Sequence, residues 1–493
     1  MTNLILALIA GLALVNVLVV RPNWWIGIVI ISVVGTFPAQ VPERIYIGGF
    51  GVALSEIALA GSALYVAARY EPSRLTDICA AVIFSVTTFF AFVGYLGAHP
   101  VNQIANDVRG LLAMSVALFV AGRIAQTSLA LTALKSLRLV LWLSFAIVTL
   151  ASFGSMQISG RVSDASLDNA ESGVTRIQSA TTHTAAAVLA ICVTLWILKA
   201  SSTRTLAWYF VPALGITILG FSRNALVILG LTVVVALLLE RRFRTCMRAV
   251  IAIGGLAAFF MATGWLLSQL SDLPGFKYVH QIFSAYSERV VGGFSADVQA
   301  TDSSTVYREL EAHNMRAAIT GHELFGHGMG YAYQPVRDKK TPTSSYYGHQ
   351  FYLWATVKTG YAGVIAYLLA FAAPILRAVR QPGMPIRSAC AACAVSLLYV
   401  STVAPLPLSS NGGPLIGALM GAAAGLCSQR TRDSKSSSSH LSEQTPPFSE
   451  GIKPDPQFAH LIAPIEDIHQ LPATSRATSG IATARNSSLS TLE

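Results

Sequence analysis

A histidine, His349, stands at the start of a long apolar stretch, in a position that suits a base. It is followed by Gln350 and then by residues 351–376, an apolar run whose only charged residue is Lys358. A run of this length can cross a bilayer as a helix, so His349 lies at the mouth of a membrane helix. An imidazole titrates near neutral pH and can accept a proton from a hydroxyl. An interfacial histidine is more often structural, however, and four other histidines nearby weaken the case for this one.

Two glycines follow this histidine at helical spacing. On a continuous helix, at about 100° per residue, Gly360 lies about 20° from His349, and Gly363 lies about 40° away on the other side. Small residues let a neighbouring helix approach closely in lipid. We therefore expect the two glycines to share a face with His349 and to fix the angle at which its imidazole is presented.

Arg223, with Ser222 before it, occupies a polar break between two apolar runs. An arginine near membrane depth is costly unless it faces a cavity or a partner. Its planar, permanently charged head suits a phosphate. An arginine that snorkels to the membrane surface is an equally good explanation of this residue alone.

A second arginine, Arg308, lies on a helix predicted over residues 303–319 by serines at its start and a glycine after its end. The charged residues that follow on this helix are Glu309, Glu311 and Arg316. Arg308 suits an anion for the same reason as Arg223. Mixed charges of this kind usually mark a solvated helix face instead.

The composition of the chain indicates a membrane protein. Of its 493 residues, 53% are hydrophobic and 12% are charged, whereas soluble domains carry about 25% charged residues. The net charge of +10 is spread over short connections without a basic face, which argues against nucleic-acid binding. The six cysteines lie in or beside apolar runs, which argues against a disulfide framework or a soluble zinc site. No Asp-x-Asp occurs in the connections assigned to the outside, so we expect neither a metal nor a cofactor.

The fold class we predict is all-α, a polytopic membrane helical bundle of about 12–13 transmembrane helices. The candidate spans are 3–20, 24–40, 50–68, 77–97, 108–122, 137–155, 182–199, 206–221, 224–240, 248–268, 348–376, 387–404 and 411–427. The first is expected to be a retained span, not a cleaved signal peptide. Glu56, near the outer end of its span, is expected to pair with a buried arginine.

Basic residues fall on alternate connections, which sets the orientation. The Lys/Arg-rich connections include Arg69 and Arg74 and are assigned to the cytoplasm. The connections around 98–106, 157–181 and 269–347 then face outward. Thirteen spans would place the N-terminus outside, and twelve would place it inside.

These features divide the chain into four parts. Residues 1–268 form an N-terminal membrane bundle, and residues 269–347 form one large extracytoplasmic loop with short helices. Residues 348–427 form the C-terminal membrane helices. Residues 428–493 are rich in Ser, Thr and Pro, so a disordered cytoplasmic tail is expected there.

The residues at the start of the long apolar run resemble a family signature. His349-Gln350, nine residues, then Gly360-Tyr-Ala-Gly363 is similar to the His-[Asn/Ser/Gln]-x9-Gly-x-x-Gly signature of bacterial O-antigen ligases and the related Wzy-type polysaccharide polymerases.

Two further motifs strengthen the resemblance to this ligase and polymerase superfamily. Ser222-Arg223 before an apolar run resembles the Ser-Arg that the family carries at this place. Tyr307-Arg308, continuing to Leu-Phe-Gly-His-Gly-Met-Gly330, is similar to the Arg…Pro-Leu-x-Gly-x-Gly run of its large periplasmic loop. The motifs span roughly residues 210–375.

The resemblance implies a membrane glycosyltransferase. Such an enzyme transfers a glycan from undecaprenyl pyrophosphate to a hydroxyl of a glycan or lipid acceptor, outside the bacterial cytoplasmic membrane. His349 would be the base, and Arg223 and Arg308 would bind the pyrophosphate, without a metal and with inversion. Supporting roles fall to Ser222, Glu309, Arg316, Gln350, Gly360 and Gly363. Polysaccharide-assembly proteins are further expected partners.

Alternatives remain at this stage. Ligase and polymerase differ in acceptor and not in leaving group, so the motifs do not separate them. A transporter or flippase of lipid-linked glycans would spread polar groups along midplane helices, whereas here they gather in one outer loop. A non-catalytic scaffold would tolerate alanine at His349.

Overall fold

The computed structural model describes residues 20–41, 44–47, 50–164, 174–241, 245–270, 276–291, 303–335, 345–381 and 383–426. All of them belong to one compact unit, Met1–Pro446. The predicted tail, and all but the last residue of the predicted span 3–20, lie outside the described residues.

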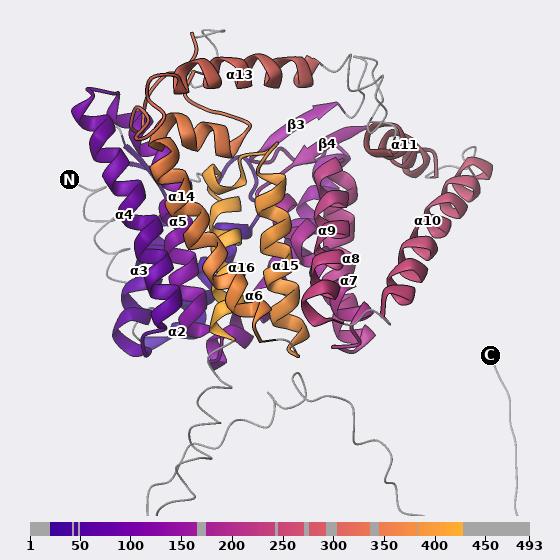
Figure 1. Ribbon diagram of the computed structural model, residues 1–493. Helices are drawn as coiled ribbons and strands as arrows, with labels where there is room; N and C mark the ends of the chain where they lie inside the picture. Colours follow the sequence, from indigo (N-terminus) through magenta and orange to yellow (C-terminus); the bar gives the residue numbers. More distant parts are fainter. Residues whose placement is uncertain are drawn as a thin grey trace, which may run out of the picture. The chain divides into compact units, whose positions relative to one another are not determined.

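Helices dominate the described residues (Figure 1). The N-terminal half contains α2 (Pro22–Val34), α3 (Leu54–Arg69), α4 (Arg74–Leu96), α5 (Val101–Ile124), α6 (Ser128–Ser152), α7 (Thr181–Ile197), α8 (Thr203–Leu219) and α9 (Arg223–Glu240). The remainder contains α10 (Cys246–Gln269), α11 (Phe276–Tyr286), the π-helical turn η2 (Ser287–Val291), α13 (Ser303–Ile319), α14 (Phe351–Val379), α15 (Pro385–Val400), the 3₁₀ turn η5 (Leu406–Leu408) and α16 (Gly412–Gly425). The predicted all-α membrane class is confirmed at this level.

Two short antiparallel hairpins were not predicted. Strand β1 (Arg44–Ile47) pairs with β2 (Phe50–Ala53), with Arg44 opposite Ala53. Strand β3 (Arg161–Asp164) pairs with β4 (Thr175–Gln178). The predicted span 50–68 is therefore wrong at its start, because its first four residues belong to β2 and the helix α3 begins only at Leu54.

Five of the described helices are long and apolar enough to cross a membrane by length and composition. They are α4, α5, α6, α9 and α14. Four further apolar helices, α2, α7, α15 and α16, are shorter. The protein is thus a multi-pass membrane protein, while the number of 12–13 spans stays a prediction.

The helix α16 packs directly on the backbone of α5. Four glycines of α16 recur at every fourth position and therefore lie on one face of that helix. A Cβ atom on any of them would lie 2.1–2.4 Å from a backbone carbonyl oxygen of α5; they are Gly413, Gly417, Gly421 and Gly425. Glycines allow this close approach of two helices in a membrane protein. The contact fixes α5, which carries several of the polar residues described below.

The helix α14 is interrupted at Gly360, whose φ of 61° and ψ of −175° are not helical. Residues 321–330, here called the glycine loop, fill the interruption. The break leaves backbone groups of α14 without helical partners, and the loop supplies four hydrogen bonds to them, at 2.7–3.1 Å. These are His327 N–H to Val357 O, Gly328 N–H to Lys358 O, Tyr361 N–H to Glu323 O, and Ala362 N–H to Leu324 O. Irregular backbone inside a membrane bundle requires such partners.

The glycine loop also contacts α4. Met329 N–H donates to Phe90 O at 2.9 Å. A Cβ on Gly328, whose φ is 86°, would lie 2.4 Å from the amide nitrogen of Gly94. The loop therefore joins α4 to α14, and its glycines are required both by their positive φ and by the space available.

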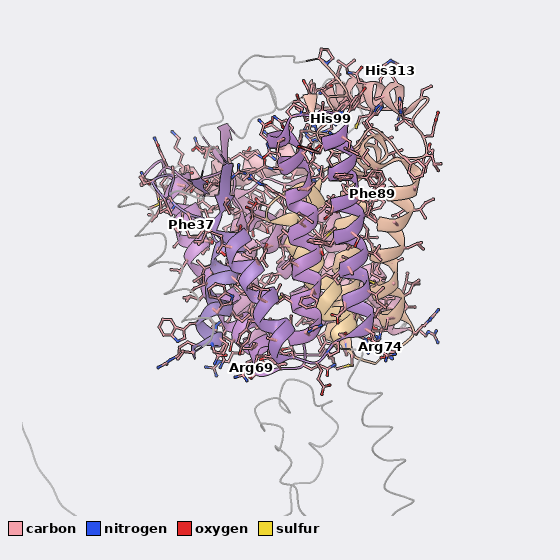
Figure 2. All side chains as sticks on the ribbon, turned by 90° about the vertical axis from the view of Figure 1, so that its left-hand side faces the viewer. Phe37, Arg69, Arg74, Phe89, His99 and His313 are labelled. Atoms are coloured by element: carbon pink, nitrogen blue, oxygen red, sulfur yellow. The ribbon has the colours of Figure 1, made fainter. Side chains whose placement is uncertain are left out.

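The two ends of the bundle carry different residues. Figure 2 shows Arg69 and Arg74 at one end and His99 and His313 at the other. This separation is the one that alternate basic connections predict for opposite sides of a membrane. The helix α13 lies across the end of α14 on the His313 side (Figure 1).

Candidate functional site

His349 lies just before α14 and not within it. The helix begins at Phe351, and Gln350 occupies the N-cap position in an extended conformation (φ −102°, ψ 97°) without a side-chain cap. The predicted alignment of His349, Gly360 and Gly363 on one helical face is therefore wrong. It assumed a continuous helix from the histidine onward, whereas the helix starts later and breaks at Gly360.

The two glycines have different neighbours. A Cβ on Gly360 would lie 2.3 Å from the carbonyl carbon of Leu324, so Gly360 admits the backbone of the glycine loop and not a neighbouring helix. A Cβ on Gly363 would lie 2.3 Å from the Thr359 side chain of its own helix and 3.0 Å from the ring of Phe90 on α4. Gly363 thus admits a neighbouring helix, as expected.

Glu311 on α13 is the immediate partner of His349. Its side chain is completely buried, whereas that of His349 is 32% exposed. The Glu311 Oε2 atom accepts the backbone N–H of His349 at 2.8 Å and lies 3.1 Å from its Nδ1 atom. A carboxylate can only accept hydrogen bonds, so the contact places the neutral imidazole's proton on Nδ1. The Nε2 atom then carries the lone pair, in the tautomer that a base requires.

Tyrosines surround this pair of residues. The Tyr333 hydroxyl donates to Glu311 Oε1 at 3.2 Å and also contacts the carbonyl of Tyr347. The rings of Tyr307 and Tyr347 stand edge-on to the imidazole, with centroids 5.9 and 5.4 Å from its own. Burial, reinforced by the Glu311 charge and opposed by Arg308, raises the pKa of Tyr347 to about 12. Tyr347 therefore stays neutral at physiological pH.

Arg308 lies one helical turn before Glu311 on α13, on the same face of the helix. It is partly buried, and its Nε atom is buried without a hydrogen-bond partner among the described residues. A buried N–H of a guanidinium is costly when it is unpaired. An anionic ligand that accepts this hydrogen bond would remove the cost.

The other predicted residues of α13 face away from this cluster. Glu309 and Arg316 are both exposed. Among the described residues, no contact links either side chain to Glu311 or His349. Their supporting roles stay predictions.

Arg223 is the first residue of α9, and its Nε atom donates to the carbonyl of Arg289 in η2 at 3.1 Å. Ser222 before it is buried at the N-cap position and makes no side-chain cap. The structure thus brings together His349, Glu311 and the helix of Arg308, and it places Arg223 against η2. The shared pyrophosphate site of Arg223 and Arg308 stays a prediction.

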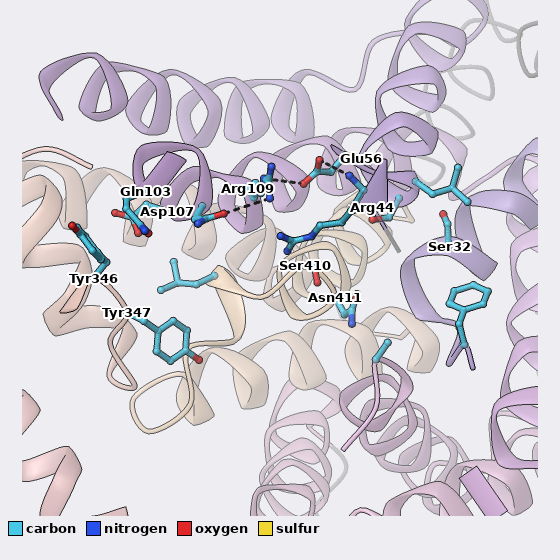
Figure 3. Close-up of a pocket in the computed structure, with 18 of the residues that line it drawn as sticks. Ser32, Arg44, Glu56, Gln103, Asp107, Arg109, Tyr346, Tyr347, Ser410 and Asn411 are labelled. Atoms are coloured by element: carbon cyan, nitrogen blue, oxygen red, sulfur yellow. Dashed lines mark hydrogen bonds and ion pairs between the residues drawn. The ribbon is translucent and has the colours of Figure 1, made fainter. Parts of the chain in front are cut away.

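A cavity of about 420 Å³ with many polar side chains in its wall reaches Tyr346 and Tyr347, shortly before His349 in the chain (Figure 3). Tyr346 and Tyr347 form one of its walls. Within it, Arg109 Nε lies 3.4 Å from Glu56 Oε1. The expected pairing of Glu56 with an arginine is confirmed, although both side chains are partly exposed.

A buried ion pair between α14 and α5 lies close to the glycine loop. Lys358 Nζ donates to Asp107 Oδ2 at 2.8 Å and to the carbonyl of Tyr331 at 2.7 Å. The same Oδ2 atom accepts Gly330 N–H at 2.7 Å. The only charge in the long apolar run is thus neutralised by α5, and the pair ties α5 and α14 to the end of the glycine loop.

Sequence reasoning missed Glu311 and Asp107 as members of the site. The spacing of Arg308 and Glu311, three residues apart on a helix, was the available signal for the first. For the second, Lys358 in an apolar run called for an acidic partner. Among the described residues, no three His, Cys, Asp or Glu side chains converge as a metal site.

Comparison with known proteins agrees with this arrangement. Residues 208–368 match the family model described as O-Antigen ligase. No curated protein and no solved structure matches the chain. The matched range includes Arg223, Arg308, Glu311 and His349, and it implies a glycosyltransferase-like enzyme in general terms. Over this range the chain is similar to the O-antigen ligase family, and the match supports the resemblance found in the sequence.

Proposed function

We propose that the protein transfers a glycan from undecaprenyl pyrophosphate to a hydroxyl acceptor, on the outer side of the bacterial cytoplasmic membrane. The observation that carries the proposal is the contact between the buried Glu311 and the partly exposed His349. The helix of Glu311 also carries Arg308, whose buried Nε–H has no hydrogen-bond partner among the described residues. The match to the O-antigen ligase model supports the ligase or polymerase type of reaction.

The proposed reaction is a direct displacement at the anomeric carbon. The acceptor oxygen forms the new bond to this carbon while the bond to the pyrophosphate oxygen breaks, and the electron pair of that bond leaves with the pyrophosphate. The acceptor proton passes to Nε2 of His349. Attack opposite the leaving group inverts the anomeric centre, and no metal is required.

Glu311 and the arginines act at opposite ends of this step. The carboxylate of Glu311 stabilises the imidazolium that forms when His349 takes the proton, and it holds the ring in the productive tautomer. Arg308 and Arg223 stabilise the charge that grows on the pyrophosphate, which is where fixed cations act most strongly on the rate.

The distribution of basic residues between the two ends of the bundle supports a reaction on the outer side of the membrane. The cluster lies on α13 and at the start of α14, and His313 of α13 marks the end opposite the basic Arg69 and Arg74 (Figure 2). Under the rule that basic connections stay in the cytoplasm, this end faces the periplasm. The partners that we propose are the lipid-linked donor, a glycan or lipid acceptor, membrane lipid and polysaccharide-assembly proteins.

Transfer from a synthetic undecaprenyl-pyrophosphate glycan tests the proposal. With the full chain in lipid nanodiscs and EDTA present, we expect transfer by the wild type, and a loss of at least about 10³-fold for His349→Ala, because the proton acceptor is removed. We expect a loss of about 10²–10³ for Arg308→Ala or Arg223→Ala, the range for removing one fixed donor to developing charge. His313→Ala, an exposed histidine on the same outer helix, is the matched control.

The products distinguish the two reaction types. One addition per acceptor identifies a ligase, and a ladder of products identifies a polymerase. Full transfer by His349→Ala, with normal protein level and membrane insertion, would reject His349 as the base. Loss of transfer with EDTA, restored by a divalent cation, would reject the metal-independent mechanism.

A further inference from the structure

The cavity lined by Tyr346 and Tyr347 has the size of a ligand site. Its volume is about 420 Å³, within the range of about 300–1,000 Å³ that is typical of small-molecule sites. Its walls include the β1–β2 hairpin with the start of α3, the segment after α2, the outer end of α5, the segment after η5, and the Tyr346–Tyr347 segment with Trp354 of α14. It is therefore built by elements outside the matched family range as well as within it.

The wall chemistry is that of a carbohydrate site. The side chains of Gln103, Asn106, Ser410 and Asn411 supply hydrogen-bond donors and acceptors for hydroxyl groups. The rings of Tyr346, Tyr347, Trp354 and Phe37 line the same space. Aromatic faces pack against the carbon–hydrogen faces of a sugar ring, while planar polar groups bind its hydroxyls. A purely apolar ligand would leave these polar groups unsatisfied.

Among the residues that the structure describes, the wall contains one cation without an ion-pair partner. Arg109 is paired with Glu56 at 3.4 Å, and Asp107 is paired with Lys358 at 2.8 Å. Arg44, on β1, is exposed and forms no ion pair among the described residues. Figure 3 shows its side chain extending into the cavity. A guanidinium in this position binds a carboxylate or phosphate with paired, charge-assisted hydrogen bonds.

Tyr347 connects this cavity to His349, because it lines the cavity and its ring stands edge-on to the imidazole, with centroids 5.4 Å apart. Tyr307, the neighbour of Arg308 on α13, also contacts the imidazole, with centroids 5.9 Å apart. In an in-line displacement the acceptor hydroxyl lies between the base and the anomeric carbon, and the leaving group's cations lie beyond that carbon. With the pyrophosphate on the Arg308 side, the cavity is the place for the acceptor.

We infer that this cavity binds the sugar unit of the acceptor and that Arg44 selects an acidic unit, one that carries a carboxylate or a phosphate. The inference rests on the proposed function for the assignment to the acceptor, since the reaction defines which glycan is the acceptor. Binding of an acidic sugar to the cavity is measurable without any transfer.

Direct binding of defined oligosaccharides to the full chain in nanodiscs tests this inference. The probes are an oligosaccharide that ends in a hexuronate and its counterpart reduced to the neutral hexose, each titrated without donor and followed by Trp354 fluorescence or calorimetry. We expect the acidic probe to bind about tenfold to hundredfold more tightly than the neutral one, the range of one charge-assisted hydrogen bond. In Arg44→Gln that preference disappears, while the neutral probe binds as before.

Two further variants complete the test. Arg69→Gln removes an exposed arginine at the other end of α3 (Figure 2) and is expected to keep the preference. Ser410→Trp fills the cavity and is expected to abolish binding of both probes. Equal binding of the two probes by the wild type, or an unchanged preference in Arg44→Gln, overturns the selection by Arg44. Unchanged binding in Ser410→Trp overturns the cavity as the site.

The failure of this inference is distinguishable from the failure of the proposed function. His349→Ala is expected to bind the acidic probe normally while losing transfer. Normal binding together with normal transfer in His349→Ala leaves the cavity assigned and rejects the mechanism. If the wild type transfers the glycan, His349→Ala does not, and the wild type shows no preference for an acidic acceptor, the mechanism stands and the inference about Arg44 is rejected.

Discussion

Replacing Glu311 by glutamine tests the role of the negative charge beside His349, the base that we propose. The amide oxygen of glutamine can take the position of Oε2, which accepts the backbone N–H of His349 at 2.8 Å and lies 3.1 Å from Nδ1. With the amide oxygen there, the Nδ1–H proton keeps its acceptor and the imidazole keeps its tautomer. The substitution removes the negative charge that stabilises the imidazolium formed during transfer, and it replaces Oε1, the acceptor of the Tyr333 hydroxyl, by an NH2 group.

The size of the effect follows from the geometry. With the nitrogen and oxygen in contact, the centres of the two charges lie about 4 Å apart, and at an effective dielectric constant of about 20 they attract by about 4 kcal/mol. This energy corresponds to a rate factor of about 10³. We therefore expect kcat for glycan transfer to fall about 10³-fold in Glu311→Gln. Because Glu311 is buried behind His349, we expect KM for the donor to change little.

The assay is transfer in nanodiscs, with kcat and KM measured separately for donor and acceptor. Glu323→Gln is the matched control, because the Glu323 side chain is exposed and accepts the backbone N–H of Gly321, which an amide oxygen can also accept. We expect it to retain normal kcat. A Glu311→Gln enzyme with kcat within about threefold of the wild type would refute the role of the buried carboxylate, as would a loss of equal size in Glu323→Gln.

Three further predictions concern the framework of the site. Gly360→Ala is expected to destabilise the protein by about 3 kcal/mol or more, because only glycine adopts this backbone conformation readily and the glycine loop fills the space. Thermal unfolding measures this loss. The control is Gly230→Ala, where a Cβ meets no atom within 4 Å, and its melting temperature should be nearly that of the wild type. Lys358→Met is expected to lower the free energy of unfolding by about 3–5 kcal/mol, because it leaves the Asp107 charge buried and unpaired. Adding Asp107→Asn to the same chain should restore part of this loss. Losses of stability that simply add in the double variant would contradict the prediction. Burial lowers the pKa of His327 below its ordinary value of 6.5. As the pH falls below 6.5, the unfolded chain therefore takes up the proton first, and the stability of the folded protein decreases. The fall in melting temperature between pH 7.5 and 5 should be smaller in His327→Gln than in the wild type, and the same pH dependence in both proteins would contradict this prediction.

Helix positions were largely predictable from the sequence. The predicted span 224–240 compares with α9 at Arg223–Glu240, and the predicted span 387–404 compares with α15 at Pro385–Val400. Long apolar runs set these boundaries through the thickness of the membrane alone. The place of His349 beside the outer end of α14 could also be predicted, because a titratable residue beside such a run is a local feature.

The break in α14 and the identity of the histidine's partner required the fold. Gly360 appears in the sequence as a packing residue in a helix, and the segment that interrupts the helix lies in a different part of the chain. Glu309 and Glu311 have the same chemistry, and only the orientation of α13 buries one and exposes the other. The hairpin of β1 and β2 has strands of four residues, which are too short to show a periodic pattern.

The order of synthesis gives the glycine loop a further consequence. Residues 321–330 leave the ribosome before α14, so the partner of the interrupted helix already exists when that helix is made. A chain from which residues 321–330 were deleted would deliver α14 with four amide and carbonyl groups unmatched, each at a cost of several kcal/mol in hydrocarbon. We therefore expect the membrane bundle to need the loop for its assembly. Without the loop, we expect the new chain to stop folding before α15 and α16 pack against the other helices.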